Sequence, residues 1–263
     1  MTDTTTMTFE QRPANPSSEV VLEASGVAVH YGGIKAVDGM SFQLTRGKIF
    51  GLLGPNGSGK STLLGAITRM TNLTRGSLSF EGTAYDRSSA SSLARRGIAR
   101  TFQTVRLLPG LTVRENIMLG VDVGRSPRST SSNVVSDAME RTGLLGLERT
   151  RPGELPYGIQ RRVEIARAIA MDPILLLLDE PTAGMNQNER HEISELLRKL
   201  RSEGLTQLLV EHDVQMMVDT CDHLFAMNFG QLIASGAPVD VVRESAVREA
   251  YLGKRWGTDA RGQ

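Results

Sequence analysis

The sequence predicts an α/β protein in which a parallel β-sheet carries a phosphate-binding loop. Three observations support this fold class. Residues 54–62 match the pattern G-x-x-x-x-G-K-[ST], an apolar run at 174–178 ends in two carboxylates, and strand and helix patterns alternate from 174 onward. Because parallel sheets bind ligands at the carboxyl ends of their strands, we expect the loop and the carboxylates to share one edge of the sheet.

The phosphate-binding loop consists of Gly54, Pro55, Asn56, Gly57, Ser58, Gly59, Lys60, Ser61 and Thr62. Its glycines permit positive φ and a close approach of main-chain N–H groups to a polyphosphate. Lys60 is predicted to reach the β- and γ-phosphates, and the Ser61 hydroxyl to bind Mg²⁺. The apolar segment 49–53 predicts a buried strand before the loop, and 60–70 predicts a helix whose N-terminus faces the anion. We therefore expect the protein to bind ATP or GTP.

The segments around this loop have the pattern of β-strands. Residues 20–54 show the alternation of half-buried strands, most clearly at Val27, Val29 and Tyr31, and 76–80 predicts a further strand. These segments extend the predicted sheet structure on both sides of the loop.

The middle of the chain, about 104–172, has a different character. Helices are predicted at 133–145 and along an apolar stripe at 163–170, and the Ser-, Arg- and Pro-rich block 124–133 predicts an exposed loop. The α/β pattern then returns, with strands expected at 174–178, 205–210 and 223–229 and helices at 187–203 and 213–220. The prediction is a helical insert within a βαβ frame.

Polar side chains follow two strands of the predicted sheet. Asp179 and Glu180 follow the apolar run, and His212 follows the strand that ends at Val210. Asp179 is expected to hold Mg²⁺, Glu180 to polarise the attacking water as general base or positioning group, and His212 to contact the γ-phosphate. Alternatively, the two acids cap the next loop, and His212 is a surface residue or a helix cap.

Two further segments are weak signals on their own. Gln103 lies in Arg100-Thr101-Phe102-Gln103 and alone predicts nothing beyond a loop residue. The segment 155–168, Leu-Pro-Tyr-Gly-Ile-Gln-Arg-Arg-Val-Glu-Ile-Ala-Arg-Ala, places a glycine-containing turn at the start of a helix, which offers main-chain donors and a dipole to an anion. The alternative for this segment is an ordinary helix start with Tyr157 in simple packing.

The order of these elements resembles the nucleotide-binding subunits of ABC transporters, from about Val20 to Gly253. This resemblance implies an ABC-type P-loop NTPase core with an antiparallel β subdomain and a helical subdomain at about 104–172. It implies ATP, with Tyr31 stacking on adenine, and it implies that Gln103 contacts Mg²⁺ and water and couples to the membrane subunit. Pro156, Tyr157 and Gly158 then belong to the signature that closes on the ATP of another subunit. The family hydrolyses two ATP at a head-to-tail dimer interface and drives alternating access in a permease.

The sequence departs from the commonest family pattern in the signature and in one loop. The signature usually reads L-S-G-G-Q, and here it reads L-P-Y-G-I, so Pro156 supplies no serine hydroxyl to the γ-phosphate. A hydrogen bond to a charged group contributes about 1.5–3 kcal/mol. Met185-Asn186 stands where the family usually has Leu-Asp, which removes a charge near the dimer axis. These departures put an equal, symmetric pair of sites in doubt.

A Tyr-Gly signature followed by Q-R-R-x-E-I-A-R resembles the ATPases of branched-chain amino acid uptake systems. The same resemblance extends to three further segments: Arg100-Thr101-Phe102-Gln103, Ala183-Gly184-Met185-Asn186 and the closing Ala250-Tyr251-Leu252-Gly253. Such systems commonly use two ATPase subunits, two permeases and a solute-binding protein, and relatives carry other small polar solutes. The implied partners are therefore permease subunits, a second ATPase subunit as homodimer or heterodimer, and indirectly a solute-binding protein.

Competing classes fit less well. A GTPase needs an N-K-x-D-like guanine reader, which the sequence lacks, and a kinase does not need the segment 155–168. A soluble ABC-type ATPase of DNA repair separates its phosphate loop from its signature by long coiled coils, and a translation type carries two ATPase domains. This sequence has neither feature. A regulatory ATP-binding subunit with weak hydrolysis is the third alternative, because Pro156 and Asn186 are unusual.

Composition limits the domain count, the binding partners and the cellular location that we expect for the protein. With 263 residues and 40% hydrophobic content, the chain can bury one large core, and a net charge of +1 gives no footprint for nucleic acid. The single cysteine, Cys221, fits a reducing cytoplasm. Residues 1–19 predict a disordered tail without a secretory signal, 254–263 a polar tail, and no apolar run reaches the ~20 residues of a membrane span. We expect a peripheral protein at the cytoplasmic face of the inner membrane.

Overall fold

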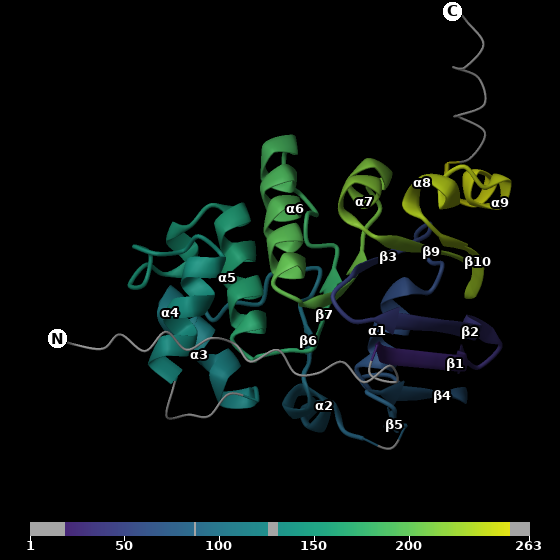
Figure 1. Cartoon of the computed structure of the whole chain (residues 1–263), viewed down its shortest axis with the longest axis horizontal. Helices are drawn as coiled ribbons and strands as arrows, with labels where there is room; N and C mark the ends of the chain where they lie inside the picture. The colour runs from purple at the N-terminus through teal and green to yellow at the C-terminus, as the bar shows by residue number, and fades with distance from the viewer. Residues whose placement is uncertain (1–18, 87, 126–130, 253–263) are drawn as a thin grey trace, which may run out of the picture.

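The computed structural model describes residues 19–86, 88–125 and 131–252 (Figure 1). Within these residues the chain forms a four-stranded sheet of order β2-β1-β4-β5 and a six-stranded sheet of order β10-β9-β3-β8-β7-β6. Helices cover the six-stranded sheet and also form a separate group at one end of the molecule. The expectation of an α/β fold with an antiparallel sheet and a group of helices is confirmed.

The six-stranded sheet contains the strands that end at the predicted site. Its members are β3 (Ile49–Leu53), β6 (Ile98–Arg100), β7 (Leu175–Asp179), β8 (Thr206–Val210), β9 (His223–Asn228) and β10 (Gln231–Gly236). All neighbouring pairs are parallel except β9 and β10, which form an antiparallel hairpin. Since β8 lies between β3 and β7, the phosphate loop after β3 and the carboxylates after β7 emerge at the same edge, on either side of His212.

The central strands β3 and β7 are almost entirely apolar because both of their faces are covered. In β7, Leu176 and Leu178 belong to the core beneath the helices, whereas Leu175 and Leu177 belong to the core beneath the antiparallel sheet. All five residues of β7 are buried, which accounts for the continuous apolar run in the sequence.

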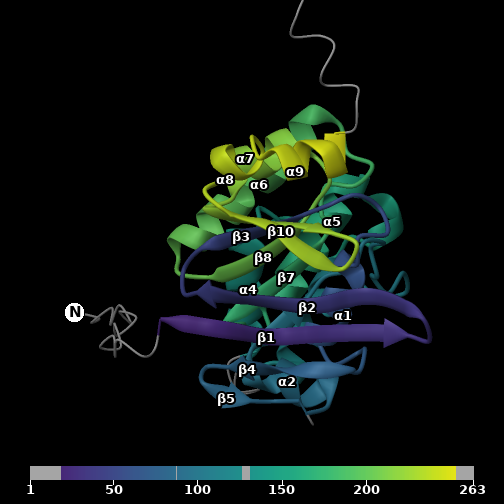
Figure 2. The same ribbon diagram turned by 90° about the vertical axis from the view of Figure 1, so that its right-hand side faces the viewer.

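The antiparallel sheet packs against the opposite face, with α1 between the two sheets. It comprises β1 (Val20–Tyr31), β2 (Ile34–Thr45), β4 (Arg75–Phe80) and β5 (Thr83–Ala84), and α1 spans Lys60–Ile67. Leu63, Leu64 and Ile67 of α1 share one buried cluster with side chains from both sheets. Figure 2 shows β1 and β2 lying below the sheet that contains β3 and β10.

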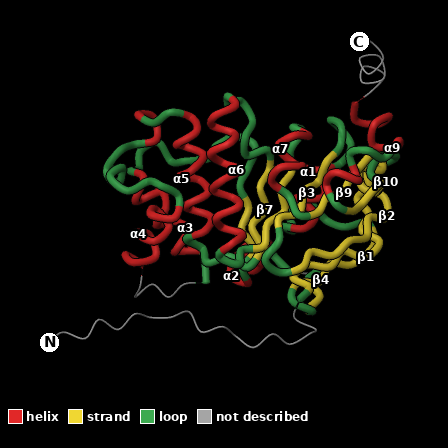
Figure 3. The backbone as a smooth tube through the Cα atoms, turned by 45° about the horizontal axis from the view of Figure 1, so that its top comes forward, coloured by secondary structure: helices red, strands yellow, loops and turns green. Residues whose placement is uncertain are grey.

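The helical group lies at the end of the molecule away from β1 and β2 (Figure 3). It consists of α3 (Val113–Val123), α4 (Ser131–Arg141) and α5 (Tyr157–Ile169), with α6 (Gln187–Ser202) and α7 (Val214–Thr220) following over the sheet. Thr112 and Glu115 form a capping box that fixes the start of α3. The remaining short elements are α2 (Ala90–Arg96), the 3₁₀ turn Pro152–Glu154, α8 (Pro238–Val241), α9 (Ser245–Val247) and the π-helical turn Arg248–Leu252.

Several element predictions need correction. The helix after the phosphate loop ends at Ile67, where the chain turns back through Arg69 at positive φ, and not near residue 70. The predicted loop 124–133 is too long, because α4 already begins at Ser131; serine and asparagine favour helix starts as well as loops. The strands β6 and β10 and the helix α3 are not predicted from the sequence.

The predicted tails at 1–19 and 254–263 lie outside the described residues, except for Glu19, whose carbonyl accepts a hydrogen bond from the Arg46 N–H. None of the helices in the described part of the chain has the length and apolar character needed to cross a membrane.

Candidate functional site

The phosphate loop has the backbone shape that its glycines predict. Gly57 and Gly59 adopt φ of 79° and 105°, in the region that favours glycine. A Cβ on Gly59 would lie 2.0 Å from the carbonyl oxygen of Ala36, and one on Gly54 would lie 2.3 Å from that of Met227. Gly59 also caps α1 without any side-chain hydrogen bond. Because the first N–H groups of a helix have no acceptor within it, this end of α1 suits an anion.

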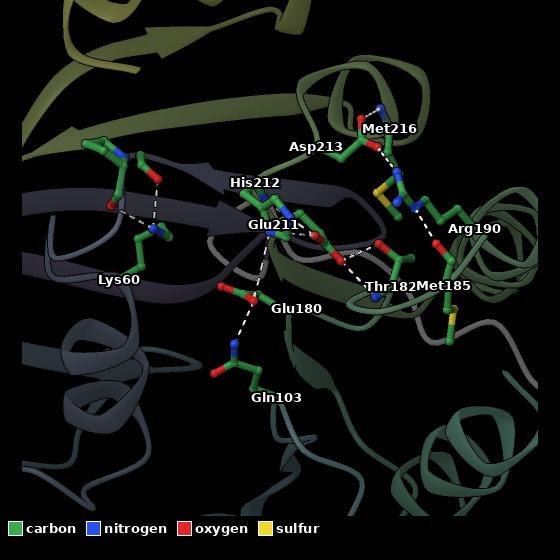
Figure 4. A network of polar contacts seen from close by, with 12 residues as sticks. Lys60, Gln103, Glu180, Thr182, Met185, Arg190, Glu211, His212, Asp213 and Met216 are labelled. Carbon is green, nitrogen blue, oxygen red and sulfur yellow. Dashed lines mark hydrogen bonds and ion pairs between the residues drawn. The ribbon is translucent and has the colours of Figure 1, made fainter. Parts of the chain in front are cut away.

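Lys60 is buried at the base of this loop. Its Nζ donates hydrogen bonds to the carbonyl oxygens of Gly54 at 2.7 Å and of Pro55 at 3.0 Å (Figure 4). Burial lowers the pKa of Lys60, and the charges of Glu180 and Asp179 oppose this effect. The ammonium group therefore lies where a polyphosphate in the loop would neutralise it.

The two carboxylates occupy different environments at the end of β7. Asp179 is buried and accepts a hydrogen bond from the Arg100 guanidinium at 2.9 Å. Glu180 is more exposed; its Oε2 accepts a hydrogen bond from Gln103 Nε2 at 2.8 Å and lies 3.9 Å from His212 Nδ1. The carboxylates thus face two different partners, a cation and an amide.

Glu180 also has a strained backbone. Its φ is 46°, a region that residues other than glycine rarely adopt, and its N–H donates to the carbonyl oxygen of Val210 at 2.8 Å. Such conformations cost about 1–3 kcal/mol and cluster at functional sites. The sequence alone does not reveal this feature.

One pocket of about 430 Å³ contains part of the predicted site. It is lined by Gly54, Pro55, Asn56, Gln103, Glu180 and His212. The structure thus brings together the first three residues of the loop, the glutamine, the second carboxylate and the histidine, whereas Lys60, Ser61 and Asp179 do not line this pocket.

The predicted magnesium ligands are a hydroxyl, an amide and a carboxylate, namely Ser61, Gln103 and Asp179. Oxygen ligands of this kind are those that Mg²⁺ prefers, and it usually keeps few protein ligands beside phosphate oxygens. The residues present fit a metal that a bound nucleotide helps to hold.

Other predicted residues lie outside this pocket. Tyr31 is at the end of β1 with its side chain 53% exposed. Pro156, Tyr157 and Gly158 are at the start of α5, where Pro156 makes no side-chain cap bond and Tyr157 is 39% exposed. None of these four lines the pocket that contains Glu180.

Sequence reasoning missed Glu211, the residue before His212. Its side chain is fully buried and accepts hydrogen bonds from Thr182, at 2.8 Å from the N–H and at 2.6 Å from the hydroxyl. Its other oxygen accepts from the His212 N–H at 3.3 Å and lies 3.7 Å from His212 Nδ1. Glu211 thus ties the segment after Glu180 to His212 (Figure 4). A carboxylate directly after an apolar strand was the available signal.

Comparisons with known proteins agree with this geometry. The family model for the ABC transporter matches residues 37–183, and the model for the branched-chain amino acid ATP-binding cassette transporter matches residues 231–256. The high-affinity branched-chain amino acid transport ATP-binding protein LivG of Escherichia coli K12 is 34% identical over 253 residues, which cover 90% of this chain and 99% of LivG. The corresponding protein BraF of Pseudomonas aeruginosa is 32% identical with the same coverage.

Among solved structures, the ADP conformation of MJ1267, an ATP-binding cassette of an ABC transporter, superposes with a TM-score of 0.82. It is 31% identical, and the match covers 89% of this chain and 99% of that one. Since the first family model spans more than half of the chain and the relatives align along almost their whole length, this protein belongs to the family of ABC transporter ATPases.

Proposed function

We propose that this chain binds ATP with Mg²⁺ and hydrolyses it to energise an importer of branched-chain amino acids or related small polar solutes. The observation that carries the proposal is the pocket in which the first residues of the phosphate loop, Gly54 to Asn56, meet Gln103, Glu180 and His212. The solute class rests on the similarity to LivG and BraF and on the C-terminal match at residues 231–256.

The loop residues would hold the nucleotide. Lys60, now bonded to two carbonyl oxygens of its own loop, would turn its ammonium group to the β- and γ-phosphates. Ser61, Gln103 and Asp179 would supply oxygen ligands to Mg²⁺, which when bound neutralises charge on the phosphates. Tyr31, exposed at the end of β1, would stack on the adenine.

Glu180 would act on the attacking water, either by accepting its proton or by orienting it. The Gln103 amide holds Oε2 of Glu180 at 2.8 Å, so the carboxylate has a fixed orientation with its second oxygen available to water. His212, on the other side of Glu180, would donate a hydrogen bond to the γ-phosphate.

A second subunit would complete the site. Pro156, Tyr157 and Gly158 lie outside the pocket of their own chain, which supports a head-to-tail arrangement in which they face the ATP of another cassette. We propose that the partners are a second ATPase subunit and transmembrane permease subunits, with a solute-binding protein acting indirectly and no nucleic acid. The chain would then lie on the cytoplasmic face of the inner membrane.

The proposal is tested with Glu180→Gln, which keeps the side-chain shape and removes the charge. This variant should bind Mg-ATP with unchanged affinity and lose turnover, while Glu195→Gln, an exposed control, should behave as the native protein. Normal turnover of Glu180→Gln would show that Glu180 does not act on the attacking water, and would make His212 the candidate for that role.

The same variant addresses the second subunit, because it should trap bound ATP. Its mass in solution is measured with and without Mg-ATP. A nucleotide-dependent dimer would show that Pro156 permits closure between two copies of this chain. A monomer that binds ATP would identify a different ATPase subunit as the partner.

A regulatory subunit with weak hydrolysis is the second candidate, because Pro156 provides no cap bond or hydroxyl at the start of α5. It predicts that the native chain binds Mg-ATP but does not turn it over in the presence of its permease and the second ATPase subunit.

A further inference from the structure

Three charged side chains on one face of α5 contact the main chain of the loop that contains Gln103. Arg161, which is fully buried, donates from Nη1 to the carbonyl oxygen of Phe102 and from Nη2 to that of Gln103, both at 2.6 Å. Its planar guanidinium presents its donors as a rigid fork, so two consecutive carbonyl groups are held in one orientation.

The other two members hold the far end of the same loop. Glu164 accepts a hydrogen bond from the Arg106 N–H at 3.4 Å, and Arg167 donates to the Arg106 carbonyl oxygen at 2.7 Å. The three side chains are also linked, since Glu164 lies 2.5 Å from Arg161 and 3.8 Å from Arg167. Residues 102–106 are therefore bonded to α5 at both ends.

The pair at the centre of these contacts, Arg161 and Glu164, is buried. The side chains of Arg161 and Glu164 are 0% and 2% exposed. Burial raises the pKa of Glu164, and the charge of Arg161 opposes that rise. Removing one member of such a pair leaves the other charge uncompensated, so the group holds together as a unit.

The side chain of Gln103 points away from α5 and toward the six-stranded sheet, where its amide donates to Glu180 at the end of β7. Phe102, next to it, packs beneath the guanidinium groups of Arg100 and Arg106, at 5.1 and 3.9 Å from the ring centre. The main chain of Gln103 is thus fixed to α5, while its amide reaches the candidate catalytic carboxylate.

We propose that Arg161, Glu164 and Arg167 are positioning residues. Through them, a change in the orientation of α5 changes the contact between Gln103 and Glu180. The inference rests on the proposed role of Gln103 and Glu180 in hydrolysis. Since α5 begins at Tyr157, directly after Pro156, a partner that moves the start of this helix would move Gln103 with it.

The first test is Arg161→Lys, with Arg162→Lys as the matched control. Lysine has a single ammonium group and cannot reproduce the two parallel bonds, whereas Arg162 is paired with Glu192 at the surface. In hydrogen exchange, the segment 102–110 should exchange about tenfold faster in Arg161→Lys, while peptides from β7 and the Arg162→Lys protein stay native. Unchanged exchange at 102–110 would overturn the proposal.

A double-mutant cycle separates positioning from general stabilisation. If Arg161 acts through Gln103, Arg161→Lys should lower turnover about tenfold in the native background and not at all in Gln103→Ala. Equal losses in both backgrounds would overturn the proposal. If Gln103→Ala alone has native turnover, the proposed function of Gln103 fails, and the exchange experiment still decides whether α5 holds the loop.

Arg167→Met provides a second variant if Arg161→Lys fails to fold. Arg167 is partly exposed, and its removal deletes one bond to the loop and one weak ion pair. Faster exchange confined to 102–110 would support the proposal, and native exchange there would contradict it.

Discussion

Replacing Glu211 by glutamine tests the buried carboxylate that joins Thr182 to His212. One oxygen of Glu211 accepts both Thr182 bonds, and the other accepts the His212 N–H. In Glu211→Gln one oxygen remains for Thr182, but the new NH₂ group faces the His212 N–H, and two donors then oppose each other.

The magnitude follows from these bonds. Hydrogen bonds to a charged group contribute about 1.5–3 kcal/mol and neutral ones about 0.5–1.5 kcal/mol, so the two Thr182 bonds together lose about 2 kcal/mol. A neutral amide costs less to bury than a carboxylate, which offsets part of this loss. We expect a net decrease of about 1–2 kcal/mol in the free energy of unfolding.

The assay is urea unfolding followed by circular dichroism, together with turnover at saturating Mg-ATP. Because His212 and the segment after Glu180 lose a shared anchor, turnover should fall about tenfold. Glu195→Gln, at an exposed position, should change the free energy of unfolding by no more than about 0.5 kcal/mol. A native unfolding midpoint combined with native turnover in Glu211→Gln would show that the Glu211 carboxylate does not anchor Thr182 and His212.

Three other outcomes are expected. Lys60→Ala should abolish ATP binding in equilibrium titration, since it removes the only ammonium group predicted to hold the β- and γ-phosphates; undiminished binding would disprove the site. Tyr31→Ala should weaken ATP by about 1–3 kcal/mol and inorganic triphosphate much less, and equal losses would remove the stacking role. Burial, reinforced by Lys48, lowers the pKa of His223 from 6.5, so below pH 6.5 the unfolded chain binds a proton that the folded chain does not. The stability contributed by neutral His223 is therefore present above pH 6.5 and is lost as the pH falls through the lower pKa of the folded state. In His223→Gln, the free energy of unfolding should depend less on pH in this range. An unchanged dependence on pH would contradict a lowered pKa of His223.

The parts of the site that are local in sequence were predictable. The phosphate loop needs a strand, glycines and a helix start within a few residues, so its pattern fixes its geometry. Asp179 and Glu180 were predictable for a related reason, because a strand buried on both faces is mostly apolar and carboxylates directly after such a run mark the edge of the sheet.

The parts that depend on distant contacts were not predictable from residue patterns. The carbonyl groups of Phe102 and Gln103 meet Arg161 only because α5 packs beside that loop in the folded chain. The positive φ of Glu180 was not predictable either, because no local pattern requires it and only contacts with the surrounding fold can hold such a conformation. The strand β6 was missed because three residues are too few to show a period.

Pro156 is a conspicuous departure from the family signature, but the free energy that it costs is small. A serine at this position would offer one hydroxyl to a phosphate, worth about 1.5–3 kcal/mol. The start of α5, with its unpaired N–H groups and dipole, does not depend on that hydroxyl, and no side chain of Pro156 competes for those N–H groups. Pro156 also fixes its own φ, at −55°, which reduces the entropy lost when the turn is ordered. If α5 closes on a partner's ATP as proposed, closure would lose one bond and keep the main-chain donors, so we expect Pro156 to weaken closure without abolishing it.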